Sequence, residues 1–249
     1  MPKVAVLSDI HGNLPAFESV LKQVDKHSVD LIVFGGDIVG YGASPAKCVE
    51  YVRALGGNCV FGNHESYTVA VADNGVESLG DWWSEDPVEA GAVHAFRSLS
   101  EDALDWIRGL PWFLPLDEDV IIAHAGLDDP NSWPYLECDE TAAPTIEIMK
   151  NRDLNIGFFG HIHKLAVFPE REPSRVDGFY ELKDAEPTAI TVGSVGQPRD
   201  KDGRASWVLF DSDERTVEFL RTEYDRELAA RQIIDAGLPA RSGERLLRR

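Results

Sequence analysis

The chain of 249 residues contains 43% hydrophobic and 27% charged residues, which is typical of a globular protein. Its formal net charge of −19 argues against duplex nucleic acid as a partner, because such binding needs a basic surface. No segment approaches the roughly 18 consecutive apolar residues of a membrane span, and the first apolar run begins too close to Met1 for a signal peptide, so we expect a cytoplasmic protein with no membrane partner.

The first quarter of the chain alternates between strand-like and helical patterns. Residues 4–7 and 31–34 are short apolar runs of the kind found in buried strands, and residues 13–27 between them show the spacing of an amphipathic helix. A second helix is expected over about 44–55 and a third strand over 58–61. This βαβαβ start predicts parallel strands covered by helices.

The segment 67–110 interrupts this alternation. It has no convincing strand, and helices are expected at 88–99 and 100–107. Two roles are open for this insertion. It could be a lid whose aromatic residues Tyr67, Trp82 and Trp83 stack on a nucleobase or another planar group, or these residues could pack the insertion against the core, which we favour.

The rest of the chain is rich in β patterns, apart from helices expected at 141–150 and 225–236. Strands are expected at 112–116, 119–123, 156–159, 165–168, 178–182, 188–192, 205–211 and 216–220. Because strands joined by short loops prefer antiparallel pairing, we expect this half to form a sheet that faces the α/β start. The basic tail 241–249 has no sustained apolar face and is expected to be solvated or frayed. No linker-like composition divides the chain, so a single domain over 1–249 is expected.

Polar residues with metal-binding side chains follow five of the apolar runs. Asp9 and His11 come after the first run, and because residues i and i+2 of an extended chain point the same way, both side chains should be aimed at one place. Ligands collect at the carboxyl ends of strands in α/β proteins, and a mixture of carboxylate and imidazole suits a first-row divalent metal. The full set of candidates is Asp9, His11, Asp37, Asn63, His64, His124, His161 and His163.

Taken in this order, the motifs from Asp9 to His163 closely resemble those of the calcineurin-like metallophosphoesterase superfamily. The later run from Gly193 to Arg199 is similar to the bacterial branch grouped with diadenosine tetraphosphate hydrolases and small phosphodiesterases. The resemblance implies an α/β (α+β) fold, a four-layer sandwich of two packed mixed β-sheets flanked by helices.

The resemblance also implies a role for each candidate. Asp9, His11 and His163 would hold a first divalent metal ion; Asn63, His124 and His161 would hold a second; Asp37 would bridge the two. A hydroxide shared by the two ions would attack phosphorus in line, and His64 would protonate the leaving oxygen or stabilise charge on the phosphoryl group. The mixed donors tolerate Mn, Fe, Co, Ni or Zn, and we expect Mn to serve best in vitro.

The expected function is hydrolysis of a small phosphorylated substrate, either a phosphodiester or a dinucleoside polyphosphate. A phosphoprotein phosphatase is an alternative that ranks lower, because Asp37 is followed by Ile38 where such phosphatases carry Asp-Arg-Gly. A non-catalytic scaffold on the same fold is a third reading. Arg199 ends a glycine-rich loop that either contacts phosphate or serves as a tight turn, and both roles stay open. The sequence leaves the natural substrate, the metal pair and the oligomeric state open.

Overall fold

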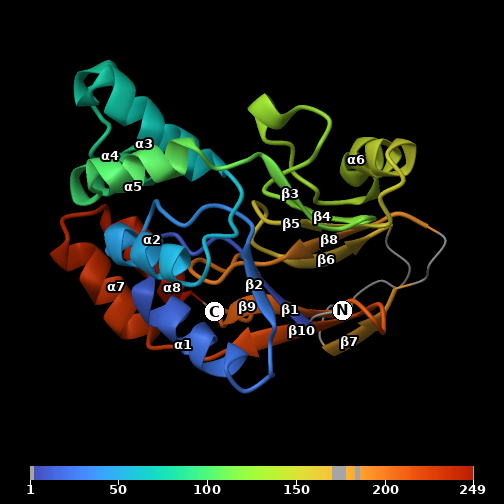
Figure 1. Ribbon diagram of the computed structural model, residues 1–249. Helices are drawn as coiled ribbons and strands as arrows, with labels where there is room; N and C mark the ends of the chain where they lie inside the picture. The colour runs from blue at the N-terminus through green and yellow to red at the C-terminus, as the bar shows by residue number, and fades with distance from the viewer. Residues whose placement is uncertain (1–2, 170–177, 183–185, 249) are drawn as a thin grey trace.

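Two β-sheets packed face to face form the centre of the protein (Figure 1). The computed structural model describes residues 3–169, 178–182 and 186–248. Alternation along β1 (Lys3–Leu7) shows how the layers arise: Val4 and Val6 belong to the core between the sheets, whereas Ala5 and Leu7 belong to the core beneath the helices. The four-layer arrangement expected from the resemblance is confirmed.

The first sheet has the strand order β2-β1-β9-β10-β7 and the second has the order β3-β4-β5-β8-β6. Beside β1, the strands of the first sheet are β2 (Leu31–Phe34), β7 (Gly178–Glu181), β9 (Ala205–Asp211) and β10 (Thr216–Thr222). Those of the second are β3 (Phe113–Asp117), β4 (Val120–Ala123), β5 (Ile156–Phe159), β6 (Leu165–Phe168) and β8 (Thr188–Val192). β1 and β2 are parallel, as predicted, and so are β4, β5 and β8.

The expectation that each half of the chain forms its own sheet is wrong. β9 pairs antiparallel with β1, so the C-terminal strands extend the sheet that the N-terminal strands begin. β8 instead pairs in parallel with β5 of the second sheet. The β-rich part of the chain is therefore divided between the two sheets, and β1 and β2 share the first sheet with β7, β9 and β10.

The helices form the outer layers (Figure 1). Helices α1 and α2 pack on the first sheet and α6 packs on the second. Helices α3, α4 and α5 lie together at one end, and α7 and α8 pack against each other beside α1. Their bounds are α1 (Leu14–Val24), α2 (Pro45–Ala54), α3 (Asn63–Asn74), α4 (Pro87–Ser98), α5 (Glu101–Arg108), α6 (Asp139–Asn151), α7 (Arg226–Asp235) and α8 (Ala240–Leu247). Within the described ranges, none of these helices combines the length and apolar character that crossing a membrane requires.

The strand expected at 58–61 is reduced to one parallel bridge between Phe34 and Cys59. The chain leaves the sheet early because the Phe61 N–H donates to Pro111 O at 2.7 Å and Gly62 then caps α3. Helix α3 itself was not expected, since its inward side carries the polar residues Asn63, His64 and Glu65 in place of an apolar stripe.

The tail expected to be frayed is helix α8 up to Leu247, which is a second correction. Its buried side consists of Ser242, Gly243 and Leu246. A side chain at Gly243 would meet the Ala230 carbonyl oxygen at 2.9 Å, so the small residues let α8 lie close against α7. Small residues carry no hydropathy signal, and for this reason the packed face was not visible in the sequence.

Candidate metal centre

Two groups of metal-ligating side chains meet beyond the carboxyl ends of β1, β2, β4 and β5, where the two sheets come together. Within each group the ligand atoms all lie within 4.8 Å of one another. The first group is Asp9, His11, Asp37 and His163, and the second is Asp37, His124 and His161. The side chain of Asn63 adjoins the second group, with its Oδ1 2.9 Å from His124 Nε2. Asp37 thus belongs to both groups, the place that the resemblance gives to a bridging ligand.

The ligand loops reach this arrangement through left-handed turns. The φ angles are 55° at Asp9, 49° at His11, 52° at Asp37, 69° at His161 and 57° at His163. Because β1 ends at Leu7, the argument from alternation in an extended strand was the wrong reason for the convergence of Asp9 and His11. A left-handed conformation costs a residue with a side chain about 1 kcal/mol or more, and such strain is concentrated at functional sites.

Backbone carbonyl groups orient three of the histidine rings. The Nδ1 atoms of His11, His124 and His163 lie 3.0, 2.7 and 2.7 Å from the carbonyl oxygens of Val39, Gly35 and Gln197, respectively. Because a carbonyl oxygen only accepts, each Nδ1 carries a hydrogen, so that each ring in its neutral form directs the lone pair of its Nε2 into the centre. His11 Nε2 and His163 Nε2 are 3.1 Å apart, a contact between two lone pairs that a cation would relieve.

The protonation of the cluster suits metal binding. Burial alone would raise the pKa of Asp9, but the adjacent rings of His163 and His11 hold this pKa well below its usual range. The pKa of Asp37 is lowered in the same way by His124, against the effect of burial. Burial lowers the pKa of His161 to about 3 and that of His163 to about 4. Against the effect of burial, the charge of Asp37 raises the pKa of His124 to about 9, so His124 has to release a proton when a metal binds. Ionised carboxylates and neutral imidazoles are the forms that bind metals.

Glu65 holds the loop that carries Asp37. Its carboxylate accepts from the backbone N–H groups of Asp37 at 2.7 Å, Ile38 at 2.8 Å, Val39 at 3.2 Å and Gly62 at 3.0 Å. Burial raises the pKa of Glu65 to about 7, although the surrounding N–H donors favour the carboxylate. The sequence pattern around Glu65 indicates no role for this residue, because the N–H groups that it binds belong mostly to a loop remote in sequence.

His64 lies at the start of α3 next to the candidate ligand Asn63. Its ring lines the same cavity as Asp37, and its backbone N–H donates to Asp37 Oδ1 at 2.8 Å. Burial lowers the pKa of His64 to about 3, so the free imidazole is neutral. Gly40, with a φ of 89°, lies against this ring, and a side chain at that position would collide with His64 Nδ1.

The cluster of candidate metal ligands opens into a cavity of about 180 Å³. Of the three residues proposed to contact substrate, Tyr67 and Arg199 line this cavity and Trp82 does not. The Trp82 side chain is 71% exposed, so the sequence-based assignment of Trp82 to the substrate site is not supported. The backbone N–H of Arg199 donates to the His163 carbonyl oxygen at 3.1 Å, which ties this loop to the centre. That the Arg199 side chain contacts phosphate stays a prediction.

Three aromatic side chains complete the cavity and were not picked out as site residues in the sequence. Tyr135 stacks on His161 with ring centroids 4.1 Å apart, Trp133 meets His124 edge to face at 5.7 Å, and Tyr41 contacts His64 at 4.5 Å. Trp133 and Tyr135 lie in an irregular loop after β4, where no periodicity indicates the direction of a side chain.

The residues present fit a pair of divalent cations. Asp37 Oδ2 and His161 Nε2 are buried and accept no hydrogen bond of good geometry within the described part of the chain. Buried polar atoms are rarely left without a partner, and these two point into the donor groups. Carboxylate, amide and imidazole donors, with the second ring nitrogens held by carbonyl groups, are the ligands of first-row divalent metals.

Comparison with known proteins agrees with this geometry. The family model described as calcineurin-like phosphoesterase matches residues 2–165. The chain belongs to the calcineurin-like phosphoesterase family. A metallophosphoesterase from Sphaerobacter thermophilus is similar in structure to this phosphoesterase, with a TM-score of 0.82, 32% identity and coverage of 98% of both chains.

Two further relatives cover nearly the whole of this calcineurin-like phosphoesterase. An uncharacterized protein of Methanocaldococcus jannaschii is 35% identical over 250 residues, which is 98% of this chain and 96% of that protein. A hypothetical protein from Pyrococcus horikoshii OT3 is 18% identical and shares the fold with a TM-score of 0.80, covering 98% of this chain and 97% of that one. With its family and its donor groups, the chain is a metal-dependent phosphoesterase.

Proposed function

We propose that this phosphoesterase uses two divalent metal ions to hydrolyse a phosphodiester or a dinucleoside polyphosphate. The observation that carries the proposal is the position of Asp37, whose carboxylate is common to two groups of donor atoms. One carboxylate between two such groups is the arrangement needed to keep two cations close enough to act on one phosphate. Mn is the ion that we expect to support activity best in vitro, with Fe, Co, Ni and Zn as other candidates.

The chain's own residues have separate tasks in this proposal. Asp9, His11 and His163 would hold one cation, Asn63, His124 and His161 the other, and Asp37 both. When bound, the cations would polarise the phosphate and make a water molecule acidic enough to attack phosphorus. His64 lines the cavity beside them, where its imidazole can donate a hydrogen bond to a phosphoryl or leaving oxygen.

The surroundings of Asp37 favour a small ester over a phosphoprotein. Ile38 and Val39, which follow Asp37, are completely buried, and their N–H groups donate to Glu65. These two positions carry no arginine, so the loop offers no side chain that could clamp a phosphate. Tyr67 and Val88, both from the 67–110 insertion, instead form part of the cavity wall. We propose that the insertion covers the substrate, with Tyr67 rather than Trp82 as its contact. A phosphoprotein phosphatase and a non-catalytic scaffold remain the alternatives.

Hydrolysis of a substrate panel with Mn tests the proposal. Wild type, His64→Ala and the control His27→Ala would be assayed on bis-p-nitrophenyl phosphate, p-nitrophenyl phosphate, Ap4A and a phosphopeptide. We expect turnover of the diester or Ap4A, at least a hundredfold loss of kcat in His64→Ala with its metal content unchanged, and no loss in His27→Ala. Preference for the phosphopeptide would favour the phosphatase, and no turnover by the metal-loaded wild type would favour the scaffold.

A further inference from the structure

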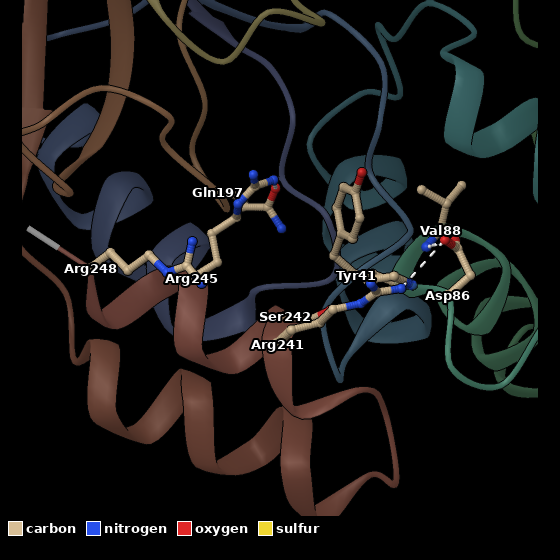
Figure 2. Close-up of a pocket in the computed structure, with 9 residues that line it drawn as sticks. Tyr41, Asp86, Val88, Gln197, Arg241, Ser242, Arg245 and Arg248 are labelled. Atoms are coloured by element: carbon tan, nitrogen blue, oxygen red, sulfur yellow. Dashed lines mark hydrogen bonds and ion pairs between the residues drawn. The ribbon is translucent and has the colours of Figure 1, made fainter.

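A second cavity lies directly beside the metal centre, between α8, the N-terminus of α4 and the loops that carry Tyr41 and Gln197 (Figure 2). Its volume is about 270 Å³. Tyr41 and Val88 line both this cavity and the cavity over the metal centre, so the two spaces adjoin. Three arginines of α8 and its C-terminal cap line this cavity and make one side of it basic: Arg241, Arg245 and Arg248.

The guanidinium groups of Arg245 and Arg248 in this cavity, and of Arg199 in the adjoining one, have few negatively charged neighbours. Among the described residues, no carboxylate lies within ion-pair distance of Arg245, Arg248 or Arg199. Arg245 reaches only Gln197 Oε1, at 3.4 Å. The pKa of Arg245 is lowered by burial and by the positive charges of Arg199 and Arg248. Such a group of unneutralised arginines stands out in a chain with a net charge of −19.

The acidic side chain in the lining does not neutralise the group. Asp86 Oδ1 accepts from the N–H groups of Val88 at 2.8 Å and Glu89 at 3.2 Å, capping α4. Its second oxygen lies 3.5 Å from Arg241, which also donates to the Glu85 carbonyl oxygen at 2.6 Å. Arg241 is thus occupied by protein acceptors, whereas Arg245 and Arg248 are available to an anion.

Gln197 connects the basic cavity to the metal centre. Its backbone carbonyl oxygen accepts from Nδ1 of His163, and its side-chain oxygen accepts from Arg245. Arg199, two residues further along, lines the metal-centre cavity and lies close enough to Arg245 for their charges to interact. A row of positive charge therefore runs from the metal centre to α8.

We propose that Arg245 and Arg248, together with Arg199, bind a second phosphate group of the substrate, so that the preferred substrates are esters carrying at least one phosphate beyond the one that is cleaved. Guanidinium groups are suited to phosphate oxygens, and a position that adjoins the reaction site favours a phosphate attached to the substrate over a free ion. This proposal rests on the proposed hydrolase function, but its test measures binding and does not depend on turnover.

Calorimetric titration of the Mn-loaded protein with AMP, ADP and ATP tests the proposal, because these ligands differ only in the number of phosphates. The variants are Arg245→Gln and Arg248→Gln, and the matched control is Arg231→Gln, an exposed arginine on α7. In wild type and the control we expect affinity to rise at least tenfold from AMP to ATP. In the two α8 variants most of this gain should be lost.

Other outcomes would overturn the proposal. If affinity does not rise from AMP to ATP in wild type, or rises equally in all four proteins, then α8 does not bind a second phosphate. Binding of inorganic phosphate that persists beside saturating AMP and disappears in Arg245→Gln would assign the cavity to a free anion.

If the predicted pattern appears in a protein that hydrolyses nothing in the substrate panel, the phosphate subsite stands and the hydrolase function fails.

Discussion

At the scale of single residues, the metal centre combines strained backbone with side chains that hold it. Asp9 and Asp37 both adopt left-handed conformations, which the chain would leave if their neighbours did not fix them. Asp9 is fixed by the loop after β8, since its carbonyl oxygen accepts from Ser194 Oγ at 2.8 Å and from the Gly196 N–H at 2.9 Å. Asp37 is fixed by Glu65.

The role of Glu65 predicts an effect of removing its charge. Glu65→Gln places an amide N–H₂ group among the backbone donors that the carboxylate now accepts, leaving at least one buried donor unpaired. We expect the free energy of unfolding to fall by about 2 kcal/mol and the protein to retain less Mn after desalting. Denaturant unfolding and metal analysis measure the two effects, with the exposed Glu50→Gln as control. Wild-type Mn content in Glu65→Gln would refute this role.

The contact between Gly40 and His64 predicts an effect on catalysis without loss of metal. In Gly40→Ala the new methyl group would collide with the His64 ring and force it away from the cavity. We expect kcat for a diester to fall at least tenfold while both metal ions are retained. Gly80→Ala is the control, since nothing lies within 4 Å of a side chain there. Full activity in Gly40→Ala would mean that the position of His64 is unimportant.

At the scale of elements, an ion pair joins the two sheets at the start of β10. Arg215, just before β10, donates to Asp119 Oδ1 at 3.0 Å and Oδ2 at 2.8 Å, and Asp119 precedes β4 of the other sheet. Asn155, next to β5, donates to the same carboxylate at 2.7 Å. The hydrogen bond from Arg215 lowers the pKa of Asp119.

This ion pair predicts a pH-dependent contribution to stability. Because the pKa of Asp119 is lower in the folded chain than in the unfolded chain, the stabilisation is complete above the unfolded value of about 4 and disappears as pH falls through the folded value. Asp119→Asn should therefore lower the free energy of unfolding by about 1 kcal/mol at pH 7, and the difference from wild type should shrink below pH 4. Urea unfolding at several pH values, with Glu118→Gln as control, checks this; a difference that grows on acidification would contradict it.

At the scale of the whole molecule, local sequence patterns predicted which side chains converge better than which strands pair. The candidate metal ligands follow apolar strands within a few residues, and short motifs such as His161-x-His163 fix the spacing between two of them. The mixed composition of the first sheet depends on the pairing between β1 and β9, in which Val6 lies opposite Val208. No local pattern encodes such a pairing, just as none encodes the stacking of Tyr135 on His161.

The count of bound metal ions tests the central claim, that two cations share Asp37, most directly. Mn would be added to purified protein, excess removed, and the ions per chain measured by mass spectrometry for wild type, Asp37→Asn, Asp9→Asn and His161→Ala. We predict about two ions in wild type, about one in Asp9→Asn and His161→Ala, and clearly fewer than one in Asp37→Asn. A single ion in wild type, or two ions retained by Asp37→Asn, would contradict the account.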